Sequence, residues 1–393
     1  MTYVRMLRDI VSLSVSGCPV GPAGASGRRS ALKWWIILSA FTRTRGGPGD
    51  VMVKPTVHDI AREAGVSLST VDRVLNGRAD VRPKNAERVK EAVRKLGYVR
   101  DTNAANLARQ RQYKFVFVLP EGPNHFVETL VAAVEEASGA QVADRTDVSV
   151  LLVDAADPHA VVDRLKTLDL SELDGVAMMV PETPQVRDAI AHIKSAGVYV
   201  VALVSDLPNS KCHYFAGVDN FSAGKTAGAL LGKFLRNETG SILVVTNSMV
   251  ARDSIERRFG LDEVLSRDFP QLKTLPTIEF YDDPDRIHET LDHALKAHPE
   301  LKAVYSMGSG NAAMLDALRE HGVAGRFVVI AHDLTPVTRQ ALADGELDAV
   351  IAQNVGHLVR SALRVLRAKC DGTDIYEAQE KIRIEIIMRE NLY

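Results

Sequence analysis

The sequence contains little cysteine: only Cys18, Cys212 and Cys370 among 393 residues. The three are odd in number, far apart and without the spacing of metal ligands, so neither a disulfide framework nor a zinc site is predicted. A reducing, cytoplasmic setting is expected. Long hydrophobic runs are also missing, because the longest, residues 31–41, contains Lys33 and is too short to cross a bilayer. No membrane partner is therefore expected.

Arrangements of catalytic residues are missing too. The histidines are scattered singles, and none has a partner at a spacing typical of nucleophilic catalysis or metal binding. Examples are His58, His125, His213, His332 and His357. The sequence therefore predicts a protein that is not an enzyme and that holds no metal or cofactor, apart from one glycine-rich loop at residues 306–313 that leaves an alternative open.

Positive charge is concentrated at the front of the chain. Residues 1–51 hold 7 Lys or Arg against 2 Asp or Glu, residues 52–112 hold 13 against 7, and the remainder holds 28 against 41. This asymmetry is typical of a nucleic-acid-binding head on a body that DNA repels. An ordinary solvated basic surface is the alternative. The length predicts two or three domains.

The basic segment contains two short runs of helical periodicity. Residues 57–64 and residues 68–75 each carry apolar side chains at helical spacing, and Gly65 between them suits a helix C-terminus. Thr56 and Ser67 each stand one residue before a run, where a hydroxyl caps the first turn. Two helices joined by a tight turn predict a helix-turn-helix, whose second helix lies in the DNA major groove.

Residues 56–112 resemble the headpiece of the lactose/galactose repressor family of bacterial transcriptional regulators. The family pattern T-x-x-D-I-A-x-x-A-G-V-S-x-x-T-V-S-R-V-L-N recurs at residues 56–76, with Asp72 in place of the usual serine. A third predicted helix follows, with Pro83 in its first turn. The resemblance implies an all-α headpiece at residues 52–99 and a hinge helix or linker at residues 100–112. Residues 1–51 are expected to be a disordered extension or the result of start-site choice, with Met52 as the alternative start.

The resemblance also implies which side chains meet DNA. Leu68, Ser69 and Arg73 occupy positions that the family uses to read bases, and Arg73 suits a bidentate contact with guanine. A phosphate contact without sequence information is the alternative for Arg73. Leu107 matches the leucine that wedges a base step apart, for which a plain linker is the alternative. The full set of predicted DNA-binding residues is Thr56, Ser67, Leu68, Ser69, Thr70, Arg73, Asn76 and Leu107.

From residue 113 onward, apolar runs alternate with amphipathic stretches such as residues 127–137 and 311–320. Continuous apolar strands between helices predict parallel sheets covered on both faces, here an α/β domain of two doubly wound lobes. The predicted strands are residues 115–119, 148–153, 175–180, 198–204, 241–246, 303–307, 327–331 and 349–352.

This part resembles the periplasmic sugar-binding-protein fold that forms the same family's effector domain. The resemblance implies one domain of two lobes over residues 113–393, with chain crossings near residues 213, 353 and 372. Ligands of open α/β sheets bind beyond the carboxyl ends of the strands, and the family's arginine and aspartate there clamp sugar hydroxyls. Helix capping is the alternative role of Asp219 and Asp333. The predicted effector-binding residues are Asn124, Phe126, Asp219, Arg257, Asn311, Asp333 and Gln353.

The glycine-rich loop at residues 306–313 permits another interpretation. Gly308 and Gly310 stand between a predicted strand and a predicted helix, and Asp333 follows about twenty residues later, which approximates a dinucleotide-binding fingerprint. Such a loop also suits a carboxylate or phosphate at a helix N-terminus. A sugar- or nucleotide-dependent enzyme with an appended DNA-binding head is therefore the alternative function.

The expected function is a sequence-specific transcriptional regulator, of the repressor type, that binds a pseudo-palindromic operator as a homodimer. By resemblance, a sugar or sugar derivative such as a pentose, hexose, uronate or polyol binds between the lobes and controls operator affinity. Whether this effector induces or co-represses stays open. A transport binding protein is disfavoured by the headpiece.

Overall fold

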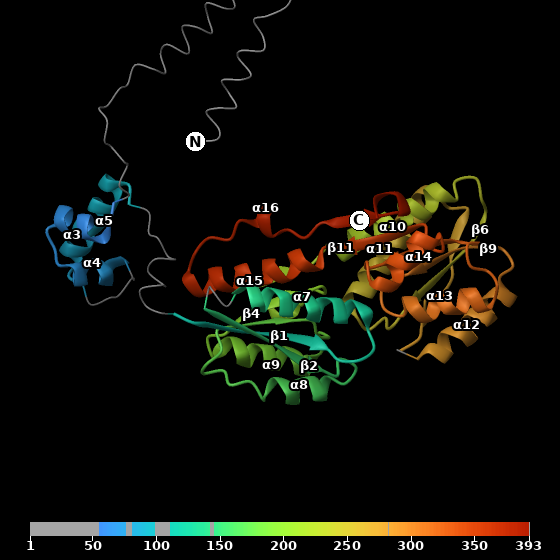
Figure 1. The fold of residues 1–393 in the computed structure, drawn as a ribbon, viewed down its shortest axis with the longest axis horizontal. Coiled ribbons are helices and arrows are strands. Elements are labelled where there is room, and N and C mark those ends of the chain that lie inside the picture. The colour runs from blue at the N-terminus through green and yellow to red at the C-terminus, as the bar shows by residue number, and fades with distance from the viewer. Residues whose placement is uncertain (1–54, 76–80, 99–110, 142–144, 282, 393) are drawn as a thin grey trace, which may run out of the picture. The chain divides into compact units, whose positions relative to one another are not determined.

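The protein is described by a computed structural model that covers residues 55–75, 81–98, 111–141, 145–281 and 283–392 (Figure 1). The chain divides into two compact units, residues 1–101 and residues 102–393. The predicted extension at residues 1–51 and most of the predicted hinge at residues 100–112 lie outside the described residues. Within the described part, no helix is both long and apolar enough to cross a membrane.

The first unit contains the predicted helix-turn-helix and the third helix. Its helices are α3 (Val57–Ala64), α4 (Leu68–Leu75) and α5 (Pro83–Leu96). Ser67 caps α4 as predicted, because its Oγ accepts from the Thr70 N–H at 3.3 Å. At the start of α3, the Asp59 carboxylate accepts from both the N–H and the hydroxyl of Thr56, at 2.9 and 2.8 Å. The three helices enclose a small core of Ile60, Ala64, Val71, Val89 and Ala92.

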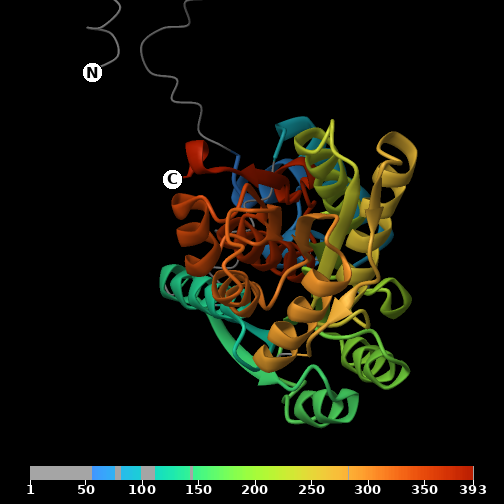
Figure 2. The ribbon, with the colours of Figure 1, turned by 90° about the vertical axis from the view of Figure 1, so that its right-hand side faces the viewer.

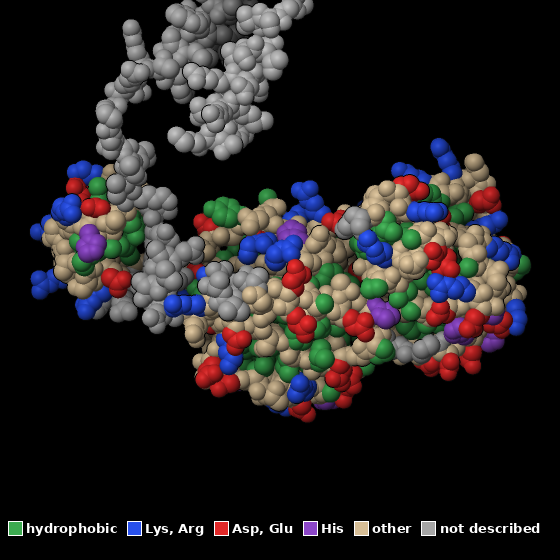
Figure 3. Space-filling model, in the orientation of Figure 1, with side chains coloured by type: hydrophobic (Ala, Val, Ile, Leu, Met, Phe, Trp, Pro, Cys, Tyr) green, Lys and Arg blue, Asp and Glu red, His purple; other side chains and the backbone are tan. Residues whose placement is uncertain are grey.

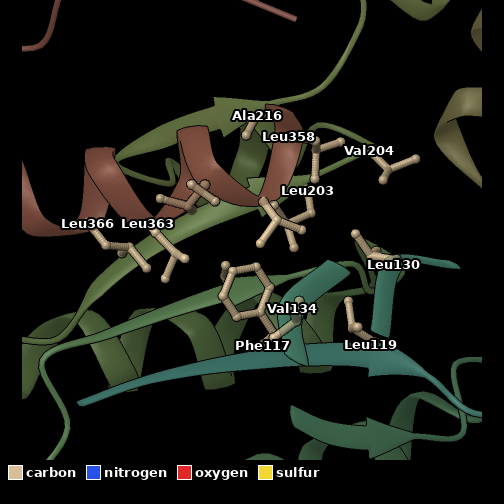
Figure 4. Packing of buried hydrophobic residues seen from close by; sticks show 14 of the residues in the cluster. Phe117, Leu119, Leu130, Val134, Leu203, Val204, Ala216, Leu358, Leu363 and Leu366 are labelled. Carbon is tan, nitrogen blue, oxygen red and sulfur yellow. The ribbon is translucent and has the colours of Figure 1, made fainter. Parts of the chain in front are cut away.

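The second unit begins with a lobe built on a five-stranded parallel sheet of order β2-β1-β3-β4-β5. The strands are β1 (Tyr113–Pro120), β2 (Thr146–Val153), β3 (Gly175–Met178), β4 (Tyr199–Leu203) and β5 (Tyr214–Ala216). Alternate residues of β1 face opposite layers, because Phe117 packs on α7 (His125–Gln141) and α15 (Val355–Asp371), whereas Val118 packs on α8 (Pro158–Leu165) and α9 (Pro184–Ser195). Figure 4 shows Phe117 between Val134 of α7 and leucines of α15.

The other lobe is built on a second sheet of order β12-β11-β10-β9-β6-β7, with β8 paired to β6. Only β12 runs antiparallel to its neighbour among the described strands of this sheet. Helices cover both of its faces (Figures 1 and 2). The strands are β6 (Gly240–Thr246), β7 (Leu272–Thr274), β8 (Ile278–Glu279), β9 (Leu301–Ser306), β10 (Val328–His332), β11 (Ala349–Gln353) and β12 (Ile384–Ile387). The helices are α10 (Asn220–Phe234), α11 (Arg252–Asp268), α12 (Pro284–Ala297), α13 (Asn311–Glu320) and α14 (Pro336–Asp344).

All eight predicted strands are confirmed, and so are both named helices, as α7 and α13. The predicted crossing near residue 213 corresponds to the passage after Ala216, because β5 still belongs to the first sheet. The third crossing follows Ile382 rather than residue 372, because α16 (Glu377–Glu380) is held to α15 by the Arg364–Glu380 ion pair and Ile382 lies in the first lobe's core.

Candidate functional site

Helix α4 presents an exposed face that carries most of the predicted base-reading residues. Leu68 is 42% exposed, and Ser69 and Arg73 are exposed beside it. Thr70 is half-buried, and its hydroxyl and that of Ser69 each lie 2.9 Å from the Ser67 hydroxyl. Ser67 and Thr70 therefore order the turn, while Leu68, Ser69 and Arg73 face outward. Asn76 and Leu107, also predicted to meet DNA, lie outside the described residues.

A cleft opens between the two lobes of the second unit, with a cavity volume of about 580 Å³. Its walls are the loops that follow β1, β2, β3 and β4 in one lobe and β6, β9 and β10 in the other. The cleft therefore lies where parallel α/β sheets bind ligands, beyond the carboxyl ends of the strands. Four predicted effector residues line it: Asn124, Phe126, Arg257 and Asp333.

Arg257 reaches the cleft because α10 and α11 cross in close contact. A Cβ on Gly224 would overlap the carbonyl oxygen of Arg257, and one on Gly260 would overlap that of Phe221. Glycine at these two positions lets the helix backbones touch. The glycine of the R-x-x-G pattern at residues 257–260 is therefore needed for the packing of α11 on α10 next to Arg257.

The Arg257 side chain is 2% exposed, and its Nε and Nη1 atoms both contact other residues of the protein. Its Nε donates to Asn220 Oδ1 at 2.9 Å, and its Nη1 donates to the Met307 carbonyl at 2.5 Å and lies 3.6 Å from Asp253 Oδ2. A planar guanidinium held in this way is pre-organised for hydrogen bonding to a ligand.

Asn220 joins the two lobes at the first chain crossing. Its amide oxygen accepts from Arg257 in one lobe, while its Nδ2 donates to the Val204 carbonyl in the other at 2.9 Å. Val204 directly follows β4, lines the cleft and has a φ of 63°, an unfavourable conformation for a β-branched residue. The Asn220 amide therefore links a strained backbone position of one lobe to the guanidinium of the other.

Asp333 occupies the corresponding position after β10 and also adopts a left-handed conformation, with a φ of 67°. Its side chain is buried, and Gln353 Nε2 donates to its Oδ1 at 3.4 Å. Burial raises the pKa of Asp333, although Arg257 and Gln353 act in the opposite direction. Asp333 does not cap α14, because Thr335 does, accepting from the Thr338 N–H at 3.3 Å.

The remaining predicted effector residues have structural contacts. Asp219 is not among the described cleft-lining residues and caps α10, since its Oδ1 accepts from the Ser222 N–H at 2.9 Å. Burial opposes the ionised form of Asp219, but the hydrogen bonds from Ser222 outweigh it and lower the pKa. Asn311 also lies outside the lining and ties β9 to β10, accepting from Ser306 at 2.6 Å and donating to the His332 carbonyl at 3.0 Å.

Two lining residues and one residue behind the lining complete the predicted set. Asn124 caps α7, with its Oδ1 accepting from the Phe126 N–H at 3.0 Å. Phe126 is only 7% exposed and belongs to the first lobe's core, so it reaches the cleft only at its edge. Gln353 does not line the cleft, but contacts it through Asp333.

The space beside the glycine-rich loop is filled by other side chains of the protein. A Cβ on Gly310 would overlap the Phe280 ring, and one on Gly308 would lie 3.3 Å from Arg257 Nη1. Both glycines also have positive φ, at 147° and 86° for Gly308 and Gly310. The pattern is explained by internal packing against Phe280 and Arg257, so the structure gives the dinucleotide interpretation no support. Among the described residues, no group of three or more His, Cys, Asp or Glu side chains is placed to hold a metal ion.

Sequence reasoning missed several charged residues of the lining: Glu121, Asp154, Glu182, Arg252 and Asp253. A usable signal existed for two of them, because Glu121 and Asp154 each directly follow the last residue of a strand. Arg252 and Asp253 are the first residues of α11. A loop joins this helix to the predicted strand at residues 241–246.

Fold and site together define the class: a helix-turn-helix headpiece in one chain with a two-lobed periplasmic-binding-protein-type domain. Residues 115–374 match the model of the periplasmic binding protein domain, and residues 56–101 match that of the bacterial regulatory proteins of the lacI family. The chain belongs to the periplasmic binding protein domain family, and its headpiece is a helix-turn-helix domain of the lacI family.

Two curated proteins are similar in sequence to part of the chain. Catabolite control protein A of Streptococcus mutans is 28% identical over 182 residues, which is 45% of this chain and 51% of that protein. The HTH-type transcriptional regulator RegA of Clostridium saccharobutylicum is 31% identical over 139 residues, 35% of this chain and 40% of that protein. The chain thus spans about half or less of the length of these curated relatives.

Two solved structures share the fold of the second unit. GanP, a glucose-galactose binding protein from Geobacillus stearothermophilus, aligns with a TM-score of 0.63 and 19% identity over 72% of this chain and 99% of that chain. A putative LacI transcriptional regulator from Bacteroides fragilis aligns with a TM-score of 0.62 and 17% identity over 72% of this chain and 98% of that chain. Both confirm the two-lobed fold.

Proposed function

We propose that this protein is a sequence-specific transcriptional repressor whose affinity for its operator is set by a small sugar-like effector in the cleft. The main support is that one chain contains both an exposed face on α4 and a cleft lined by the buried residues Arg257 and Asp333. A guanidinium and a carboxylate facing one cavity supply the donors and acceptors that vicinal hydroxyls need. The proposed setting is the cytoplasm, where the operator DNA is.

The proposed DNA-bound form is a homodimer on a pseudo-palindromic operator. A single headpiece with one short recognition helix contacts only a half-site, and a two-fold dimer presents two such helices to adjacent major grooves. The headpiece carries Lys and Arg side chains around the face visible in Figure 3, which suits binding to the phosphate backbone.

In the proposed mechanism, the effector shifts the balance between open and closed arrangements of the two lobes. The Asn220 amide lies on the connection between them, bonded to Arg257 in one lobe and to Val204 in the other. A ligand that hydrogen-bonds to Arg257 therefore affects both lobes through the Asn220 amide. Whichever arrangement the effector binds better decides whether it induces or co-represses.

We propose no catalytic role. The relative RegA is a transcriptional regulator by name, and the glycine-rich loop that favoured an enzyme packs against Phe280 and Arg257. Unchanged sugar after prolonged incubation with the purified chain is the expected result, and chemical turnover of a bound sugar contradicts the proposal.

The direct test is selection of duplexes from a random-sequence pool by the full chain, with and without a panel of sugars. The expected result is enrichment of a two-fold symmetric motif whose recovery changes with one of the sugars. Recovery of random sequence under every condition would overturn the proposal, whereas a motif indifferent to all sugars would overturn its effector part alone.

Arg73→Ala is expected to relax the selected motif at one position of each half-site and to cost about 1–3 kcal/mol of specific binding. The cause is loss of a guanidinium that is exposed on α4. Arg94→Ala serves as the control, because it removes the same charge from an exposed position on α5. The control is expected to leave base preference intact. If both variants lower specific and random-sequence affinity equally, Arg73 is a phosphate contact.

A further inference from the structure

The charge of the cleft is divided unequally between its two walls. The first lobe contributes three carboxylates, Glu121, Asp154 and Glu182, and among the described lining residues it contributes no lysine, arginine or histidine. The second lobe contributes two arginines and two aspartates, which balance. The uncompensated negative charge of the cleft therefore lies on the wall of the first lobe.

Two of these carboxylates are neighbours on adjacent strands. Pro120 of β1 pairs with Val153 of β2, and the Glu121 N–H donates to the Val153 carbonyl at 2.8 Å, so Glu121 and Asp154 begin their loops at the same level. Neither carboxylate forms an ion pair with a described residue, and Asp154 accepts only from the Ala156 N–H, at 3.0 Å. Both residues are exposed, and two carboxylates on neighbouring strands without a counter-ion favour a cation nearby.

The arginines of the other wall are already engaged by the protein. Arg257 is bonded to Asn220 and Met307 and lies against Asp253. Arg252 Nε lies 2.8 Å from Glu256 Oε1. The charge of each arginine is therefore already offset by a neighbouring carboxylate, and a bound anion would also face the acidic wall of the first lobe.

Helix N-termini near the cleft attract anions in principle, because their N–H groups and dipoles are positive. At α8 and α9 the protein's own oxygens accept from these N–H groups. Asp157 caps α8 by accepting from the His159 N–H at 2.8 Å, and Thr183 caps α9 by accepting from the Val186 N–H at 3.4 Å. Asp253 lies in the first turn of α11. Glu182 accepts from the Asn209 amide and from the N–H and hydroxyl of Ser210. Glu121 and Asp154 are not helix caps, so capping does not account for these two carboxylates.

A second, independent observation lies behind the cleft floor. Gln353 is 5% exposed, its Nε2 is bonded to Asp333, and its Oε1 is a buried acceptor without a hydrogen-bond partner. Buried polar atoms usually have a partner, so an orphaned acceptor beside a cleft residue indicates a missing donor. Gln353 does not itself line the cleft, but its oxygen behind Asp333 lacks a hydrogen-bond donor rather than an acceptor.

We infer that the cleft selects its ligand by charge and takes a polyhydroxy compound bearing an ammonium group, such as an amino sugar, in preference to the neutral sugar and to the sugar acid or phosphate. This inference rests on the proposed function, because it names the ligand class of the same cleft. The ammonium group lies against Glu121 and Asp154, and the hydroxyls meet Arg257 and Asp333. Of the sugar classes expected from resemblance, uronates are excluded.

The experiment compares sugars of equal stereochemistry and different charge, by calorimetric titration of the full chain at pH 7 and low salt. The probes are glucosamine, glucose, glucuronate and glucose 6-phosphate, with the amino, neutral and acid members of the galactose and mannose series. Within a series that binds, the amino sugar is expected to bind about tenfold more tightly than the neutral sugar, and the anions about a hundredfold more weakly. The advantage of the amino sugar is expected to shrink as salt is added.

The double variant Glu121→Gln, Asp154→Asn keeps the size of both side chains and removes their charge. It is expected to abolish the preference for the amino sugar and to leave the affinity for the neutral sugar within about threefold. Asp147→Asn is the matched control, because Asp147 lies on β2 at the end away from the cleft and is exposed. This control is expected to keep the full preference.

An anion that binds as tightly as its neutral counterpart overturns the charge inference while leaving the sugar-effector proposal standing. So does a preference for the amino sugar that survives in the double variant. If no sugar of any charge binds although the chain selects a DNA motif, the sugar part of the proposed function fails, and the inference fails with it.

Discussion

Replacing Gly260 by alanine is expected to destabilise the second unit by about 3 kcal/mol or more and to abolish its response to ligand. The new Cβ would overlap the Phe221 carbonyl oxygen and would lie 2.8 Å from the Lys225 backbone nitrogen. Both obstacles are backbone atoms of α10, which have no rotamer to change. The two helices must therefore move apart, and Arg257 moves with α11, away from its bond to Asn220.

Gly139→Ala is the matched control for this prediction. Gly139 also lies within a helix, α7, but a Cβ there has nothing within 4 Å. Because alanine restricts the unfolded chain more than glycine does, this variant is expected to be more stable by about 0.5–1 kcal/mol. The same substitution thus has opposite signs at two helical sites.

Urea unfolding followed by circular dichroism measures the stability of both variants, and titration with the tightest-binding sugar of the panel measures the response to ligand. A Gly260→Ala protein as stable as the wild type would show that α10 and α11 need no backbone contact. A destabilised variant with unchanged sugar affinity would show that this contact does not position Arg257.

Much of the fold was predictable because its signals are local. The eight predicted strands lie in apolar runs, and the headpiece helices carry periodicity, a serine cap and Gly65 at the turn. The strands that were missed, β5, β7, β8 and β12, have two to four residues each and lie toward the sheet edges. Such short segments carry too few apolar residues to separate a strand from a loop, and they form because a neighbouring strand offers hydrogen bonds.

The candidate site was predicted only in part, because some of its contacts join residues that are far apart in the sequence. Arg257 and Asp333 were found through resemblance, and both line the cleft. The Asn220 link between the lobes depends on contacts over 16 and 37 positions in the chain, which no sequence pattern records. Asp219 directly precedes α10, whereas Asp333 lies three residues before α14, and the sequence did not predict the first residue of either helix closely enough to tell the cap from the cleft residue.

Asp333→Asn is expected to abolish the ligand response and at the same time to raise the free energy of unfolding at pH 7. Burial raises the pKa of Asp333 above that of the unfolded chain, so the unfolded state releases this proton more readily. The stability that this carboxyl contributes is fully present below its unfolded pKa of 3.8 and is lost as pH rises through its folded pKa. Asparagine avoids this loss, still accepts from Gln353 and tolerates a φ of 67°.

The gain in stability is therefore expected to be largest at pH 7 and to shrink as the pH falls toward 4, which urea unfolding at pH 7 and pH 4.5 measures. Asp219→Asn is the control with the opposite sign. The pKa of Asp219 is lowered in the folded chain, so its ionised form stabilises at neutral pH and the amide is expected to destabilise there. A loss of stability in Asp333→Asn at pH 7 would show that the Arg257 charge outweighs burial, and an unchanged ligand response would remove Asp333 from the binding site. Because one buried carboxylate is proposed both to cost stability and to bind the effector, the two effects must appear together in the same variant.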